Sequence, residues 1–261
     1  MGKINYIIIC KISKNQIKIG DIIRVLELFK NDNFQIVTNK VHNSFFKKFN
    51  NKEVLDEKKF KNKDKKAKII NLVIGKIIDN SFFDINDFID STPDKIIMYD
   101  LFKKLKKFKE KKKFKFQHRD TYKIGFNWMV PSNWKIKSYP QKNWQYLETN
   151  LITNNNIKIS WQKKMGLNNY VSWINSCDII ISVVGLGVHI SRYFNKPTIV
   201  LIGPTDFQES KNDDFFFNIY PKKRCSVHKK KLNINYKKCS CMKTIKVKQI
   251  IKKTLDLLNY E

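Results

Sequence analysis

Apolar and polar positions along the chain predict strands that alternate with amphipathic helices. Short, wholly apolar runs between polar loops are typical of buried strands in a parallel sheet, whereas apolar residues spaced three and four apart indicate helices. In the first half we expect a lysine-rich loop at 51–66, strands at 5–12, 34–39 and 68–76, and helices at 22–30, 41–49 and 93–108. This alternation predicts an α/β domain with a parallel sheet.

The second half of the chain has the same alternation. We expect a surface loop around 215–217, strands at 121–130, 156–162, 177–184 and 197–203, and helices at 143–152, 167–176, 188–194 and 247–260. A basic connector near 105–118 separates the halves, so we expect an N-terminal domain at 1–118 and a C-terminal domain at 119–261. Two Rossmann-like domains of this kind predict a central cleft at the carboxyl ends of their strands.

Composition narrows the class of protein. Hydrophobic residues make up 42% of the 261-residue chain, which excludes a wholly disordered protein and allows a substantial core. No apolar run approaches the roughly 18–20 residues of a membrane-spanning helix, and the N-terminus has no signal-peptide cleavage pattern. We therefore expect a cytoplasmic protein.

The formal net charge of +29 comes almost entirely from lysine, because only four of the 52 basic residues are arginine. Base readout and bidentate phosphate binding favour arginine, so a nucleic-acid-binding protein is a distant alternative. The abundance of lysine, isoleucine and asparagine indicates a general substitution bias rather than selection for a binding stripe. A charge of this size still attracts anionic surfaces, whether phospholipid, polyphosphate or RNA, and alone leaves the partner open.

One turn has residues suited to holding a phosphate. Gly185 and Gly187 lie where the strand at 177–184 gives way to the next helix, and His189 follows them. Glycines let backbone N–H groups approach a ligand, and a helix N-terminus favours an anion. The turn is not the dinucleotide-binding fingerprint, because the third glycine is missing. A tight structural turn with a capping or packed His189 explains the same residues.

The segments around this turn form an ordered series of motifs. HIS at 189–191 opens the helix, and KPT at 196–198 and GPT at 203–205 flank the strand that follows. Upstream, SNWKIKSYP at 132–140 precedes an aromatic helix position at Trp144. This series resembles the C-terminal half of the family 9 glycosyltransferases, the ADP-heptose:lipopolysaccharide heptosyltransferase family. The likeness continues more loosely through the N-terminal half.

The resemblance implies a GT-B fold and metal-independent transfer of heptose or a related sugar, from an ADP-linked donor to a lipopolysaccharide or other surface glycan. It implies that Asp21, which follows Gly20, is the general base for the acceptor hydroxyl. It also implies that Lys137 and the turn at 185–189 stabilise the diphosphate. The donor-binding residues that it implies are Ser132, Lys137, Met165, Gly185, Gly187, His189 and Thr205. Asp21 is also suited to capping a helix, and Lys137 to a solvated position.

The resemblance places the acceptor on a lipid anchor at the inner face of the inner membrane. Lysines within 103–115 are then expected to attract the protein to that anionic surface, at about 1 kcal/mol for each residue near it. Composition alone explains the same lysines. We expect a monomer that associates peripherally with the membrane.

The chain departs from the family pattern at the donor turn. Val184 stands where the family has an aspartate that binds hydroxyls of the donor sugar, and the segment between Trp161 and Met165 is much shorter. These differences leave open a second hypothesis, a non-catalytic relative that binds nucleotide sugars or glycans.

Five cysteines in a chain without a secretory signal argue against a disulfide framework. Cys10 and Cys177 lie in apolar strand contexts and are expected to be buried thiols. Near the C-terminus, a zinc cluster is an alternative to free thiols, although Cys-x-Cys is a poorer metal clip than Cys-x-x-Cys. Its ligands would be Cys225, His228, Cys239 and Cys241.

Overall fold

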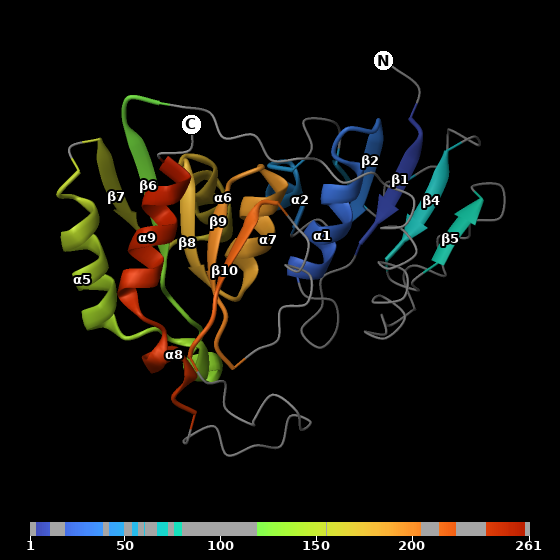
Figure 1. Ribbon diagram of the computed structural model, residues 1–261. Coiled ribbons are helices and arrows are strands. Elements are labelled where there is room, and N and C mark those ends of the chain that lie inside the picture. The colour runs from blue at the N-terminus through green and yellow to red at the C-terminus, as the bar shows by residue number, and fades with distance from the viewer. Residues whose placement is uncertain are drawn as a thin grey trace. The chain divides into compact units, whose positions relative to one another are not determined.

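The computed structural model comprises two compact units, Met1–Glu110 and Lys111–Glu261 (Figure 1). We refer to them as the N-terminal unit and the C-terminal unit. The structure describes residues 4–10, 19–38, 42–49, 54–56, 60, 67–72, 76–79, 119–154, 156–204, 214–222 and 239–258. The expected helix at 93–108 and the connector at 105–118 lie outside these residues.

The N-terminal unit is built on a five-stranded sheet in the order β3-β2-β1-β4-β5. Its strands are β1 (Tyr6–Ile9), β2 (Phe34–Thr38), β3 (Val54–Asp56), β4 (Lys68–Asn71) and β5 (Lys76–Asp79). Helix α1 (Ile19–Phe29) connects β1 to β2, and α2 (Asn43–Phe46) connects β2 to β3. The apolar stripe of α1 is buried, as its helical spacing requires. The expected α/β class is therefore confirmed for this half.

Two expectations for this sheet were wrong. The segment at 68–76 is not one strand: β4 is parallel to β1, and β5 pairs antiparallel with β4. A continuous apolar run does not show where a chain reverses direction, because both strands have the same composition. The segment expected as a loop at 51–66 contains β3, whose three residues are too few to produce a periodic signal.

The C-terminal unit has a second five-stranded sheet, in the order β10-β9-β8-β6-β7, and every pairing in it is parallel. Its strands are β6 (Tyr122–Asn127), β7 (Ile157–Trp161), β8 (Ile179–Val183), β9 (Thr198–Leu201) and β10 (Phe216–Ile219). Its helices are η4 (Ser132–Lys137, a 3-10 helix), α5 (Gln141–Leu151), α6 (Leu167–Asn175), α7 (Leu186–Tyr193), α8 (Cys241–Thr244) and α9 (Val247–Leu258).

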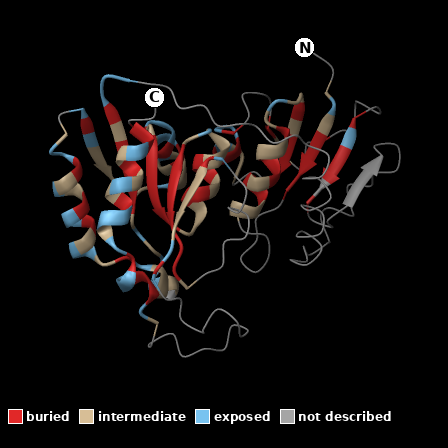
Figure 2. Ribbon diagram, viewed as in Figure 1, coloured by how far each residue is buried: buried red, intermediate tan, exposed pale blue. Residues whose placement is uncertain are grey.

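Helices cover both faces of this sheet. Helices α5 and α9 pack together on one face, and α6 and α7 pack together on the other (Figure 1). Neighbouring residues of β8 and β9 point to opposite layers: Ile181 and Leu201 join the core under α5 and α9, whereas Val200 packs with Val188 of α7. Burial is nearly complete along the central strands (Figure 2).

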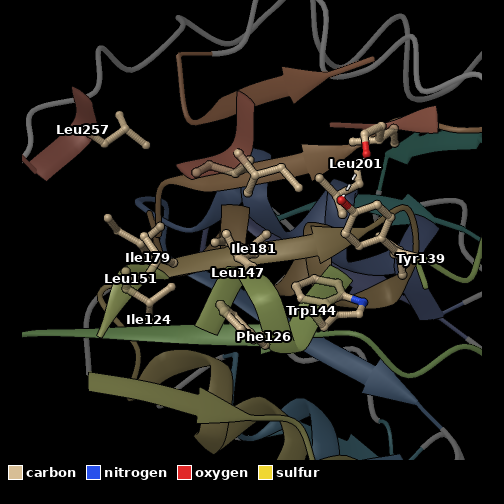
Figure 3. Packing of buried hydrophobic residues seen from close by; sticks show 14 of the residues in the cluster. Ile124, Phe126, Tyr139, Trp144, Leu147, Leu151, Ile179, Ile181, Leu201 and Leu257 are labelled. Atoms are coloured by element: carbon tan, nitrogen blue, oxygen red, sulfur yellow. Dashed lines mark hydrogen bonds between the residues drawn. The ribbon is translucent and has the colours of Figure 1, made fainter. Parts of the chain in front are cut away.

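The larger core has an aromatic centre. Trp144 of α5 is fully buried, with its ring centroid 5.0 Å from that of Phe126 and 5.6 Å from that of Tyr139 (Figure 3). The Tyr139 hydroxyl donates to the Ile245 carbonyl at 3.1 Å and so ties the segment between η4 and α5 to the segment between α8 and α9. The aromatic position expected at Trp144 thus holds the segment after β6 against the core.

The expectation of a surface loop at 215–217 was wrong, because Phe216–Ile219 forms β10 at the edge of the sheet. Three consecutive phenylalanines show no alternation, so the pattern could not identify an edge strand with two partly covered faces. Helix α8 was also not expected. Among the described residues, no helix is long and apolar enough to cross a bilayer.

Candidate functional site

The carboxyl ends of the five parallel strands define one edge of the C-terminal sheet. Strand β6 leads to β7 on one side, and β7 then leads back to β8 on the other side of β6. The connections therefore diverge between β6 and β8, and in open α/β sheets ligands bind at such a switch point. The segments after β6, β7, β8 and β9 contain the described candidates for donor binding, so all of them lie along this edge.

Gly185 is the residue at which β8 gives way to α7. Its backbone is extended, with φ of 175° and ψ of −165°, a conformation that other residues also adopt. A Cβ built there would meet no described atom within 4 Å. No side chain caps the first turn of α7 within the described part of the chain. Gly185 is half-buried, and this uncapped helix N-terminus can offer backbone N–H groups to an anion.

Gly187, two residues further on, is required by packing. It is buried, and a Cβ at this position would collide with the side-chain amide of Asn127 and the hydroxyl of Tyr170. Asn127 ends β6 and Tyr170 lies on α6, so three segments meet beneath the first turn of α7. The glycine allows this close approach.

A chain of hydrogen bonds runs beneath the turn. The Tyr170 hydroxyl donates to Asn127 Oδ1 at 2.8 Å, and Asn127 Nδ2 donates to Ser182 Oγ at 2.7 Å. Ser182 Oγ in turn donates to the Val183 carbonyl at 2.7 Å. Burial raises the pKa of Tyr170, so its hydroxyl stays protonated as a donor. The network holds β6, β8 and α6 in one arrangement.

The sequence reasoning did not identify Asn127, Tyr170 or Ser182. Two of them could have been found in the sequence as polar residues in apolar strands. Ser182 is the hydroxyl residue within the apolar run of β8, and Asn127 ends the apolar β6. A polar residue on a buried strand needs a partner, and these two strands are neighbours.

Lys137 and Ser132 lie on η4, which follows β6. The Lys137 ammonium is 4.3 Å from the centroid of the Trp134 ring, a cation–π arrangement that holds the charge at this edge of the sheet. Ser132 is exposed. Met165 follows β7 and is half-buried, and Gly166 immediately precedes α6 at a position where an added Cβ would meet no described atom within 4 Å. Three helix N-termini, those of α5, α6 and α7, thus follow strands at one edge.

His189 and Val184 lie on either side of the open glycine. His189 is half-buried on α7, within the helix rather than in the turn. Val184 packs against Val188, Val200 and Ile202 between α7 and the sheet. The position where a sugar-binding aspartate was expected is therefore part of an apolar cluster.

The segment after β9 is described only in part. Gly203 is buried against Met242 of α8, whose side chain would collide with a Cβ at this position. Thr205, Cys225 and His228 lie outside the described residues. Cys239 is half-buried and Cys241 is buried. Within the described residues, no group of histidine, cysteine and acidic side chains could hold a metal ion.

Asp21 belongs to the N-terminal unit, in the first turn of α1. Its side chain is 43% exposed, and its Oδ1 atom lies 3.4 Å from Nη1 of Arg24, which is 13% exposed. Arg24 is a further candidate that the sequence reasoning missed. Because α1 follows β1, the first turn of α1 faces the carboxyl edge of the N-terminal sheet, at the switch point between β1 and β4.

The expected buried thiols Cys10 and Cys177 are confirmed.

Solved structures with a similar fold match nearly the whole chain. A family 9 glycosyltransferase from Veillonella parvula DSM 2008 is 12% identical, with a TM-score of 0.60 over 99% of this chain and 98% of that one. ADP-heptose LPS heptosyltransferase II of E. coli is 10% identical, with a TM-score of 0.59 over 98% of each chain. The chain has the fold of family 9 glycosyltransferases. This GT-B likeness, expected from the sequence motifs, is confirmed at the level of the fold.

A third structure is a dodecameric iron-containing heptosyltransferase, TibC, in complex with ADP-D-beta-D-heptose. It is 9% identical, with a TM-score of 0.54 over 98% of this chain and 77% of that one. No protein-family model and no curated protein sequence matches the chain. At these identities the comparisons show the fold alone.

Proposed function

We propose that this protein is a glycosyltransferase that moves a sugar from a nucleotide diphosphate donor to a lipid-anchored surface glycan. The observation that carries the proposal is the N-terminus of α7, which no described side chain caps, at the switch point of the C-terminal sheet. A diphosphate at Gly185 accepts hydrogen bonds from backbone N–H groups and interacts favourably with the helix dipole. The whole-chain likeness to glycosyltransferases supports this assignment.

The departing diphosphate needs positive charge, because negative charge develops on it as the glycosidic bond breaks. Lys137 supplies a cation on the neighbouring segment, where Trp134 steadies it. We propose that this lysine and the α7 N-terminus act in place of a metal ion. Transfer should then persist in the presence of a chelator.

The acceptor hydroxyl needs a base to remove its proton as its oxygen attacks the anomeric carbon. We assign this role to Asp21, which Arg24 orients through the 3.4 Å ion pair. The proton passes to the carboxylate, the acceptor oxygen bonds to the sugar, and the nucleotide diphosphate leaves with the bonding electrons.

The donor nucleotide is proposed to be ADP, since two proteins of similar structure are an ADP-heptose heptosyltransferase and a heptosyltransferase in complex with ADP-D-beta-D-heptose. Met165 follows β7 at the same edge and supplies an apolar contact for the base, while Ser132, His189 and Thr205 contact the phosphates and sugar. The sugar is heptose or a related one. Val184 offers no hydrogen bond to it, so other residues must select the sugar.

We propose that the protein acts as a monomer held peripherally at the cytoplasmic face of a membrane, because the proposed acceptor is lipid-anchored. A second candidate, a non-catalytic nucleotide-sugar-binding protein, is favoured by one observation. Val184 is built into an apolar cluster at the position where a sugar-binding acid was expected.

A thermal-shift panel tests the proposal. ADP and ADP-sugars should raise Tm, whereas UDP, GDP and their sugars should not. A ligand at 100 times its Kd stabilises the folded state by about 2.7 kcal/mol, so binding should be visible as a shift. Absence of a shift with every nucleotide would overturn both candidates. Binding of ADP-sugars without transfer to extracted lipid-linked glycans would favour the non-catalytic one.

A further inference from the structure

The two helix layers of the C-terminal unit differ in charge. Exposed residues on α6 and just after it are neutral, among them Asn169, Ser172 and Asn175, and no lysine occurs between Lys164 and Lys196. The opposite layer, which comprises α5, α8 and α9, has exposed lysines. These are Lys142, Lys243, Lys246, Lys248 and Lys252. Its exposed acidic residue is Asp256.

A substitution bias alone does not explain this difference. Lysine makes up most of the 52 basic residues of the chain, so a uniform bias would place it on both layers. Among the described helices, lysine is present in one layer and absent from the other, although both layers have solvent-exposed positions. The arginine of the α6–α7 layer, Arg192, is half-buried and lies over the Phe215 ring. A one-sided cationic surface produces a directed field that orients the protein toward an anionic partner.

We propose that the α5–α8–α9 layer is a docking surface for an anionic lipid bilayer. Lys248 and Lys252 are one helical turn apart on α9, and Lys142 is followed one turn later by Tyr146 on α5, which is 51% exposed. Lysine ammonium groups interact with lipid headgroups as point charges, and tyrosine favours the interface between headgroups and acyl chains. Helices α5 and α9 pack side by side, which brings these residues onto one surface.

A lipid surface fits this layer better than a nucleic acid does. The described residues of α5, α8 and α9 include no arginine, the side chain that binds phosphate bidentately and reads bases. The inference extends the proposed function, on which it rests for the location of the acceptor. This inference differs from the expectation that lysines within 103–115 attract the protein to the membrane, because it assigns the membrane contact to the C-terminal unit, which contains the proposed donor site.

The test moves charge from one layer to the other at constant net charge. Lys248→Gln/Lys252→Gln removes two lysines from α9, and a second variant adds Ser172→Lys/Asn175→Lys to restore the charge on α6. Binding is measured by flotation with vesicles of phosphatidylcholine and phosphatidylglycerol, at low and high salt. Each lysine near the surface raises partitioning about fivefold, so we expect both variants to bind roughly 25-fold more weakly than the wild type. High salt should weaken wild-type binding.

Three outcomes would overturn the inference. They are full recovery of binding in the charge-restored variant, wild-type binding that is equal on pure phosphatidylcholine, and lysine-dependent binding to polyuridylate without binding to vesicles. A thermal shift with ADP on each variant separates this inference from the proposed function. If the variants bind ADP like the wild type but no longer bind vesicles, the result supports the lipid-docking surface. If the wild type does not bind ADP but binds anionic vesicles, the result contradicts only the proposed function.

Discussion

The α-carbon of Gly187 lies directly against the side-chain amide of Asn127. The two residues come from elements far apart in the sequence, the first turn of α7 and the end of β6. Their contact joins the candidate diphosphate site to a buried hydrogen-bond network. The two glycines of the turn therefore have different roles. Gly187 allows α7 to pack closely against Asn127 and Tyr170, whereas Gly185 leaves room for a ligand at the helix N-terminus.

Gly187→Ala should destabilise the protein. The added methyl group would overlap the Asn127 amide and the Tyr170 hydroxyl, and overpacking a core costs about 1–3 kcal/mol. Urea denaturation would measure the loss in the free energy of unfolding. An unchanged midpoint would show that the turn relaxes without cost and that the packing role is wrong.

Gly185→Ala is the matched variant for function. Its backbone suits alanine and its Cβ position is open, so the free energy of unfolding should stay within about 0.5 kcal/mol of wild type. The methyl group would stand where a diphosphate approaches the helix N-terminus, so affinity for ADP should fall roughly tenfold. Calorimetric titration with ADP measures this. Equal affinity in wild type and variant would remove Gly185 from the site.

Lys137→Ala should weaken ADP binding without unfolding the protein. A hydrogen bond to a charged group contributes about 1.5–3 kcal/mol, which corresponds to roughly 10- to 100-fold in Kd. Lys135→Ala is the control, because it removes an exposed lysine from the same 3-10 helix. Equal losses in the two variants would attribute the effect to general charge rather than to the placement of Lys137 over Trp134.

Alkaline pH should destabilise the C-terminal unit through two tyrosines, Tyr139 and Tyr170. Burial raises the pKa of Tyr139 to about 12 and also raises the pKa of Tyr170, whereas tyrosine in an unfolded chain ionises near pH 10. The folded state therefore retains protons that the unfolded state loses. Stability should be unaffected below about pH 10 and should then fall by about 1.4 kcal/mol per pH unit for each tyrosine.

Phenylalanine variants isolate this effect. Tyr139→Phe and Tyr170→Phe should each reduce the slope of unfolding free energy against pH between about pH 10 and 12, whatever they do to stability at neutral pH. Tyr146→Phe, at a 51% exposed position, serves as the control. Slopes that are the same in all three variants would mean that other groups cause the alkaline loss.

The sequence predicted most of the C-terminal unit because its strands are apolar runs of ordinary length, as in β8, and its helices have a clear apolar stripe, as in α9. The glycine turn and Lys137 were also located from sequence, at the ends of those strands. Strands β3, β5 and β10 were missed because pairing partners, rather than periodicity, define short strands. The Asn127 network depends on three segments that meet only in the folded chain.

Asp21→Asn should abolish transfer while leaving donor binding intact. Asparagine keeps the size of the side chain but cannot accept the acceptor's proton, and loss of a general base lowers kcat by about 10²–10⁴-fold. The carboxylate belongs to the N-terminal unit, whereas the candidate diphosphate site belongs to the C-terminal one, so ADP should bind the variant as it binds the wild type. Asp32→Asn, just beyond the end of the same helix, is the control for altered charge. Transfer at the wild-type rate in Asp21→Asn would leave Asp21 as the partner of Arg24 alone, and the base would have to be sought among other residues.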